Sequence, residues 1–193
     1  MTKGRLEAFS DGVFAIIITI MVLELRPPEG AALEDLGALW PAFLAYLMSF
    51  ALLGIWWANH HHLLHLATKV NGAVLMANLY LLFWISLFPF GTAWVGDTQF
   101  APVPLAVYAG IQSLAGAAYY ILVRALIRVP GQTPALVAAI GRDLKGKASS
   151  LLYLVSIPIA LVALAAAVAI FVAVAALWII PDRRMERALD GGR

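Results

Sequence analysis

The chain has 193 residues, of which 63% are hydrophobic and only 12% are charged, with a formal net charge of +2. A water-soluble domain carries about 25% charged residues, so this chain has too little polar surface to fold in water and is predicted to be an integral membrane protein. The absence of cysteine excludes disulfides and thiolate metal sites. No nucleic-acid partner is predicted, because the basic residues gather where a membrane topology would put them. No cofactor is predicted.

Long apolar runs separated by short polar segments predict an all-α membrane protein. The strands of a membrane barrel would instead alternate polar and apolar residues at every second position. A helical span needs about 20 apolar residues. We therefore expect one membrane domain over residues 1–193, with helices at about 5–25, 38–65, 72–96, 103–127, 149–163 and 167–181.

The first helix begins with Arg5-Leu-Glu-Ala-Phe9-Ser10-Asp11 and continues into an apolar run. A charge deep in a bilayer costs at least about 2.5–3.5 kcal/mol, so such groups usually have partners. One interpretation is local, with Asp11 favoured by the helix N-terminus and Arg5 reaching out to water. A polar network that joins Arg5, Ser10 and Asp11 to other helices accounts for all three residues, and we favour it.

Further along the same helix, Ile16, Thr19, Ile20 and Leu23 fall within an arc of about 100° when successive residues turn by about 100°. Ser10 and Asp11 lie outside that arc. The four residues are either ordinary packing or lipid-facing positions, or a stripe that lines a pore by meeting its copies around an axis. Apolar rings of this kind gate ions by excluding water.

The second helix ends in Trp57-Ala-Asn59-His60-His61-His62-Leu-Leu-His65. His61 and His65 have the i, i+4 spacing that lets two imidazoles share a metal, but no carboxylate or thiol is near in sequence, so no metal site is predicted. Asn59, His60 and His61 are expected at the same membrane depth as Arg5 and Asp11. They are the predicted partners of that network.

Thr92-Ala-Trp-Val-Gly-Asp97 faintly resembles the carbonyl filter of ordinary potassium channels. Such a filter needs a re-entrant loop, and the short connection to the next helix leaves no room for one. We interpret this segment as the end of a span.

Charge distribution predicts the topology. Two Lys and Arg residues precede the first span, five lie between Arg124 and Lys147, and four follow Pro181. Under the positive-inside rule these three regions are cytoplasmic. Both ends are then on one side, so the apolar block 149–180 should form two helices that turn near 163–168.

The residues Arg5, Phe9, Ser10 and Asp11 resemble the N-terminal motif of the transmembrane protein 175 family, the lysosomal-type potassium channels and their bacterial relatives. The resemblance extends to Trp57-Ala-Asn59-His60-His61, to Ser86-Leu-Phe-Pro89-Phe90-Gly-Thr92 and to Ile180-Pro181-Asp182-Arg183-Arg184. It therefore covers the whole chain.

This resemblance implies a potassium-selective cation channel in a bacterial inner membrane, built as a homotetramer around a pore lined by the first helix. Ile16 would form the constriction, and Thr19, Ile20 and Leu23 would form further layers. The polar residues would hold helices together rather than contact ions; these are Arg5, Phe9, Ser10, Asp11, Trp57, Asn59, His60 and His61.

The residues also suggest two other functions. A proton-coupled ion transporter would use Asp11 and the histidines of the second helix as a relay, and it predicts inverted repeats that the chain does not clearly show. A membrane enzyme would need a carboxylate or nucleophile near His60 and His65, and none is evident. We therefore predict no enzymatic activity.

Overall fold

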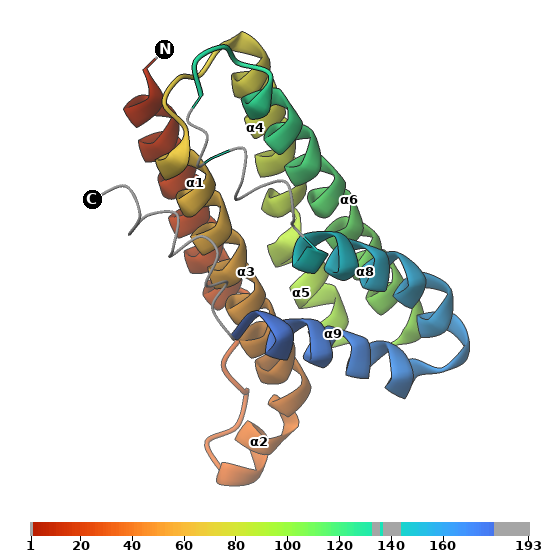
Figure 1. Ribbon diagram of the computed structural model, residues 1–193. Helices are drawn as coiled ribbons and strands as arrows, with labels where there is room; N and C mark the ends of the chain where they lie inside the picture. The colour runs from red at the N-terminus through yellow and green to blue at the C-terminus, as the bar shows by residue number, and fades with distance from the viewer. Residues whose placement is uncertain (1, 133–135, 137–143, 180–193) are drawn as a thin grey trace.

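The computed structural model describes residues 2–132, 136 and 144–179. In these residues every regular element is a helix, as Figure 1 shows. The helices are α1 (Lys3–Leu23), α2 (Leu33–Ala38), α3 (Trp40–Leu66), α4 (Gly72–Ser86), α5 (Phe88–Asp97), α6 (Pro102–Ile127), α8 (Leu144–Val162) and α9 (Leu164–Ile179). The prediction of an all-α chain is confirmed.

Five helical segments of the described chain are long and apolar enough to cross a membrane. They are Lys3–Leu23, Trp40–Leu66, Gly72–Asp97, Pro102–Ile127 and Lys145–Val162. The segment Leu164–Trp178 is also apolar but is shorter. The fold therefore has the helix lengths and hydropathy of a multi-pass membrane protein.

The first two long helices, α1 and α3, pack against each other, and the connection between them contains the short helix α2 (Figure 1). We did not expect α2, because six residues of mixed polarity give no span signal. The Asp35 side chain stabilises its first turn by accepting a hydrogen bond from the Ala32 amide at 3.0 Å. The helix predicted at 38–65 begins at Trp40, with Pro41 in its first turn.

The helix predicted at 72–96 is divided at Leu87 into α4 and α5. Pro89 has no amide hydrogen to donate to the Ile85 carbonyl, which interrupts the helical bonding at this point. At the same place the Leu87 amide donates to the carbonyl of Trp84, three residues earlier, at 3.3 Å. Asn71 caps the start of α4, where its Oδ1 accepts a hydrogen bond from the Val74 amide at 3.0 Å.

The segment Thr92–Asp97 is helical in α5, and Thr92 is buried. Its hydroxyl donates to the Phe88 carbonyl at 2.7 Å and lies 2.7 Å from the Ser49 hydroxyl of α3. A β-carbon added to Gly96 would lie 2.8 Å from the Ala42 backbone, so the glycine permits a close contact between α5 and α3. This segment is a packed span end.

As far as Ile179, the apolar block predicted at 149–180 is helical and is divided at Ala163 into α8 and α9. The Trp178 indole donates to the Ser149 hydroxyl at 2.8 Å, so the end of α9 returns to the start of α8 (Figure 1). Helix α8 starts at Leu144 and α9 at Leu164, each earlier than predicted. The sequence from Ile180 to Arg184 lies outside the described residues.

The connections of the long helices are divided between two ends of the molecule. The N-terminus, the turn from α3 to α4 and the end of α6 lie at one end, at the top of Figure 1. Helix α2 and the turn from α5 to α6 lie at the other. Residues Lys3, Lys69, Arg124 and Arg128 therefore share the first end.

Candidate functional site

Helix α1 has one buried and one exposed face. Leu6, Phe14, Ile17 and Met21 are each at most 3% exposed and pack into the core. On the other face, Ile16 is 58% exposed, Ile20 41% and Leu23 78%. Thr19 is exposed with them. The predicted stripe is thus a continuous surface of the protomer that no other described helix covers.

The Thr19 hydroxyl is held by its own helix. It donates a hydrogen bond to the Ile16 carbonyl at 2.8 Å. A hydroxyl whose hydrogen is engaged in this way still has oxygen lone pairs that can accept a hydrogen bond or face a cation. Thr19 therefore adds a polar oxygen between the apolar side chains of Ile16 and Ile20.

Ser10 is part of a buried chain of hydrogen bonds that crosses three helices. Its hydroxyl donates to the Leu6 carbonyl at 2.8 Å and accepts a hydrogen bond from Asn78 Nδ2 of α4 at 3.0 Å. Asn78 Oδ1 lies 2.6 Å from His60 Nε2 of α3. Because that oxygen is an acceptor, the bond places the histidine proton on Nε2. These bonds fix the rotation of α1 against α3 and α4.

Asp11 makes a second connection between α1 and α3. Its Oδ1 accepts a hydrogen bond from the Trp57 indole at 3.0 Å. Trp57 is 42% exposed, and its ring stacks on that of His61 with centroids 5.6 Å apart. Asp11 thus lies beside an aromatic surface of α3, away from the exposed stripe.

The other predicted network residues lie apart from these hydrogen bonds. Phe9 is 50% exposed. It precedes Ile16 by seven residues, which is about two helical turns, so it lies with the stripe instead. Arg5 is exposed and has no hydrogen bond or ion pair with the described residues. The Asn59 carbonyl accepts a hydrogen bond from the Tyr119 hydroxyl at 3.3 Å.

The residue that connects Ser10 to His60 is Asn78, which our sequence reasoning did not single out. It is fully buried in α4. An amide in an otherwise apolar span, Leu-Met-Ala-Asn78-Leu-Tyr, is itself a signal of a hydrogen-bond partner on another helix.

His61 and His65 lie on an exposed side of α3. The His61 and His65 rings stack with centroids 6.1 Å apart and an angle of 21° between their planes. Within the described residues, no group of three or more His, Cys, Asp or Glu side chains is arranged to hold a metal ion. The Lys3 ammonium donates to the His65 carbonyl at 2.9 Å, which attaches the start of α1 to the end of α3.

The sequence and the fold are both similar to known proteins. The model of the family "Endosomal/lysosomal potassium channel TMEM175" matches residues 5–89. A protein of Chryseobacterium sp. (strain P1-3) named potassium channel is 48% identical over 189 residues, which cover 98% of each chain. The mouse endosomal/lysosomal proton channel TMEM175 is 39% identical over 94 residues, which cover 41% of this chain and 19% of the mouse protein.

The fold is also similar to that of a solved structure. The crystal structure of a lysosomal potassium-selective channel TMEM175 homolog from Chamaesiphon minutus superposes with a TM-score of 0.79 at 30% identity. The match covers 92% of this chain and 96% of that one.

Proposed function

Because this chain belongs to the TMEM175 family, we propose that it is a potassium-permeable cation channel of a bacterial cell membrane. Several copies, four by our expectation, assemble with the exposed face of α1 around a common pore. The proposal needs no cofactor, and potassium is the permeant ion. The bacterial relatives and the channel structure support it.

The observation that carries this proposal is the uncovered stripe of α1. Ile16, Ile20 and Leu23 are exposed, while the polar residues Ser10 and Asp11 are engaged with α3 and α4. If several copies bring this stripe to one axis, they form rings of isoleucine and leucine with a threonine ring between them. Such a pore selects by its width and by the cost of dehydrating the ion in an apolar constriction.

We assign the narrowest ring to Ile16. It is the first large aliphatic residue of the exposed stripe after the polar start of the helix, and Thr19 follows one turn later with an available oxygen. Ile20 and Leu23 continue the apolar lining. Ser10, Asp11, Trp57, Asn78 and His60 hold α1 in register.

We also propose six spans with both ends in the cytoplasm. Helix α9 has 16 residues, which is about 24 Å at 1.5 Å per residue, against a hydrocarbon core of about 30 Å. Its contact with α8 through Trp178 and Ser149 supports a hairpin of two spans, which would return the chain to its starting side. The basic residues at the N-terminal end of the molecule then face the cytoplasm.

Proton conduction is the second candidate function. It is favoured by the name of the mouse relative and by the Ser10–Asn78–His60 chain of hydrogen bonds inside the spans. A proton-coupled transporter that uses Asp11 and the histidines is a variant of the same idea. Either one would move charge along the interior of a protomer rather than along the stripe of α1.

Recording from the purified protein in a planar bilayer tests these alternatives. With a gradient of potassium chloride and equal pH on both sides, the channel proposal predicts single-channel steps whose reversal potential follows the potassium gradient. A current that reverses with an imposed pH gradient, and is unchanged when potassium is replaced by a large organic cation, would instead establish proton conduction.

A further inference from the structure

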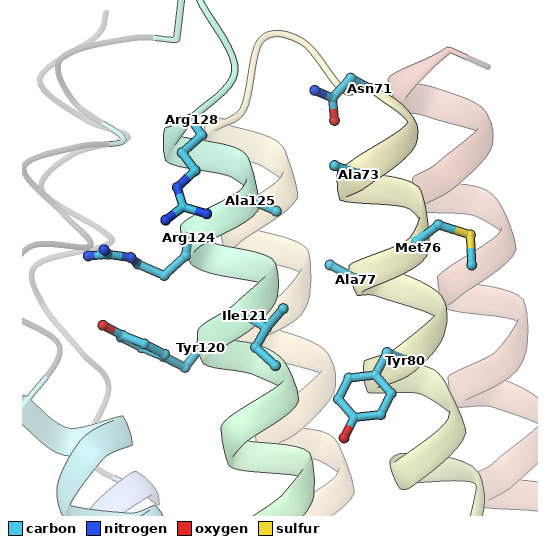
Figure 2. A pocket seen from close by; sticks show the side chains of 10 residues that line it. All are labelled: Asn71, Ala73, Met76, Ala77, Tyr80, Tyr120, Ile121, Arg124, Ala125 and Arg128. Atoms are coloured by element: carbon cyan, nitrogen blue, oxygen red, sulfur yellow. The ribbon is translucent and has the colours of Figure 1, made fainter.

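A groove of about 700 Å³ lies between α4 and α6, and no part of the polar network or the α1 stripe contributes to it. Figure 2 shows its lining. The groove is at the end of the molecule that carries the N-terminus (Figure 1). One part of its wall is cationic and the other is apolar.

The apolar part of the groove is lined mainly by small side chains, which leave space between the two helices. Ala73 and Ala77 of α4 face Ala125 and Ile121 of α6 across the groove (Figure 2). The deeper part of the groove is bordered by Tyr80, which is 42% exposed and lies eight residues beyond the start of α4 at Gly72. Eight residues of helix are about 12 Å, so this part reaches well into the span. A flexible apolar chain fits such a wall.

The cationic part is on the α6 side, where Arg124 and Arg128 are exposed one turn apart. Within the part of the chain that the structure describes, the ion pair is Lys3–Glu7, and neither arginine has an acidic partner. The Arg124 guanidinium lies over the Tyr120 ring, 5.9 Å from its centroid. Both guanidinium groups therefore keep donors for an anion.

The opposite rim adds an amide. Asn71 uses its Oδ1 to cap α4, which leaves the Nδ2 donors of the same side chain facing the mouth of the groove. Guanidinium and amide groups together match the oxygens of a phosphate. The polar mouth lies at the ends of two spans, and the apolar floor lies below it.

We propose that this groove binds an anionic phospholipid, with its phosphate at Arg124 and Arg128 and one acyl chain against Ala73, Ala77 and Ile121. Basic pockets between spanning helices bind anionic headgroups in this way. Free phosphate would use only the mouth of the groove. A second copy of the chain would have to bury both cations, which is costly without acidic partners. The proposal holds whichever cation the protein conducts.

Native mass spectrometry of the intact protein in a neutral detergent tests this site. The protein is titrated with phosphatidylglycerol and, separately, with phosphatidylcholine of the same acyl chains. Arg124→Gln/Arg128→Gln removes the charges, and Ala73→Trp fills the groove and leaves both arginines in place. Arg26→Gln/Lys147→Gln is the matched control, because it removes two exposed cations elsewhere.

We expect the wild type to prefer phosphatidylglycerol. The double arginine variant should need roughly tenfold to thirtyfold more of this lipid for half saturation. Ala73→Trp should also weaken binding, whereas the control variant should match the wild type, and excess inorganic phosphate should not displace the lipid.

Three results would overturn the proposal. The first is equal binding of both lipids, and the second is wild-type affinity in the double arginine variant. The third is an oligomer mass of the double arginine variant or of Ala73→Trp that differs from the wild type while lipid binding is unchanged. This result would make the groove a contact between subunits. None of these readouts depends on ion conduction, so failure here is distinguishable from failure of the proposed function.

Discussion

Ile16 and Val22 lie on one helix and are both exposed, but they differ by about 120° in direction around its axis. Ile16→Asn should place an amide in the proposed constriction, hydrate it and lower the selectivity for potassium over sodium several-fold. The measurement is the reversal potential with potassium on one side of the bilayer and sodium on the other.

Val22→Asn is the matched control, because it makes a similar substitution outside the stripe. It should leave the reversal potential at the wild-type value. Equal effects of the two variants would show that selectivity does not reside on the face that Ile16 marks.

Asn78 is the centre of the buried hydrogen bonds to Ser10 and His60. Asn78→Leu keeps the approximate size of the side chain but leaves His60 Nε2 without its partner, and an unsatisfied buried group costs about 1–3 kcal/mol. Ser10 loses the bond from Asn78 and keeps its bond to the Leu6 carbonyl. We expect a clearly lower midpoint of thermal unfolding for the purified protein in detergent.

Ser86→Ala on the same helix is the control, because its hydroxyl is exposed and donates only to the Phe83 carbonyl. It should shift the midpoint little. If Asn78→Leu unfolds no earlier than Ser86→Ala, the buried bonds do not stabilise the fold.

The sequence predicted several of these residues but not how they pair. Hydropathy and helical angles separated Ser10 and Asp11 from the stripe, because those properties depend only on position along one helix. The bond between Asp11 and Trp57 and the link through Asn78 join positions 46 and 68 residues apart. Such pairing depends on how the helices pack, which no local pattern specifies.

The contact between α3 and α5 depends on a glycine. Gly96→Ala should push the new methyl group into the Ala42 backbone at 2.8 Å and destabilise the protein by about 1–3 kcal/mol. Gly110→Ala in α6 meets nothing within 4 Å, so it should be neutral or stabilise by up to about 1 kcal/mol. Thermal unfolding of the two variants measures the difference.

The outcome that would contradict this interpretation is equal stability of the two glycine variants. The contact between α3 and α5 would then accommodate the added methyl group with no loss of stability. Either helix could then shift by a few tenths of an ångström.

The long helices were predictable because each needs only an unbroken apolar run of span length. The division between α4 and α5 was not predicted, although Pro89 was visible in the sequence. A proline can stand in the first turn of a new helix or inside a continuous, kinked one. The sequence around Pro89 does not distinguish these two cases. Helix α2 was not predicted, because its six residues form no apolar run and are stabilised by a local cap.

For the whole molecule, the proposal requires a homotetramer, whose mass light scattering or native mass spectrometry can measure. Asp11→Ala removes the acceptor of the Trp57 indole and loosens α1 on α3. We expect this variant to lose tetramer. Glu7→Ala, one turn earlier on α1, removes only the surface pair with Lys3 and should remain tetrameric.

The alternative outcome is an intact tetramer of Asp11→Ala with altered conduction. Asp11 would then belong to the ion path rather than to the attachment of α1.

The absence of cysteine makes the topology directly measurable. Single variants Thr2→Cys, Gln99→Cys and Arg193→Cys can be labelled in intact cells with a membrane-impermeant maleimide. The six-span proposal predicts that only Gln99→Cys reacts before the cells are opened. Labelling of Arg193→Cys from outside would show that the number of spans is odd.

The two attachments of α1 also restrict how the proposed pore, which this helix would line, could open. Rotation of α1 about its axis would carry Ser10 away from Asn78 and Asp11 away from Trp57, so each such step breaks a bond inside the protomer. Tilting or sliding α1 together with α3 and α4 preserves both bonds while it moves Ile16 relative to the axis. Gating by a rigid three-helix unit is therefore energetically cheaper than gating by a turning helix.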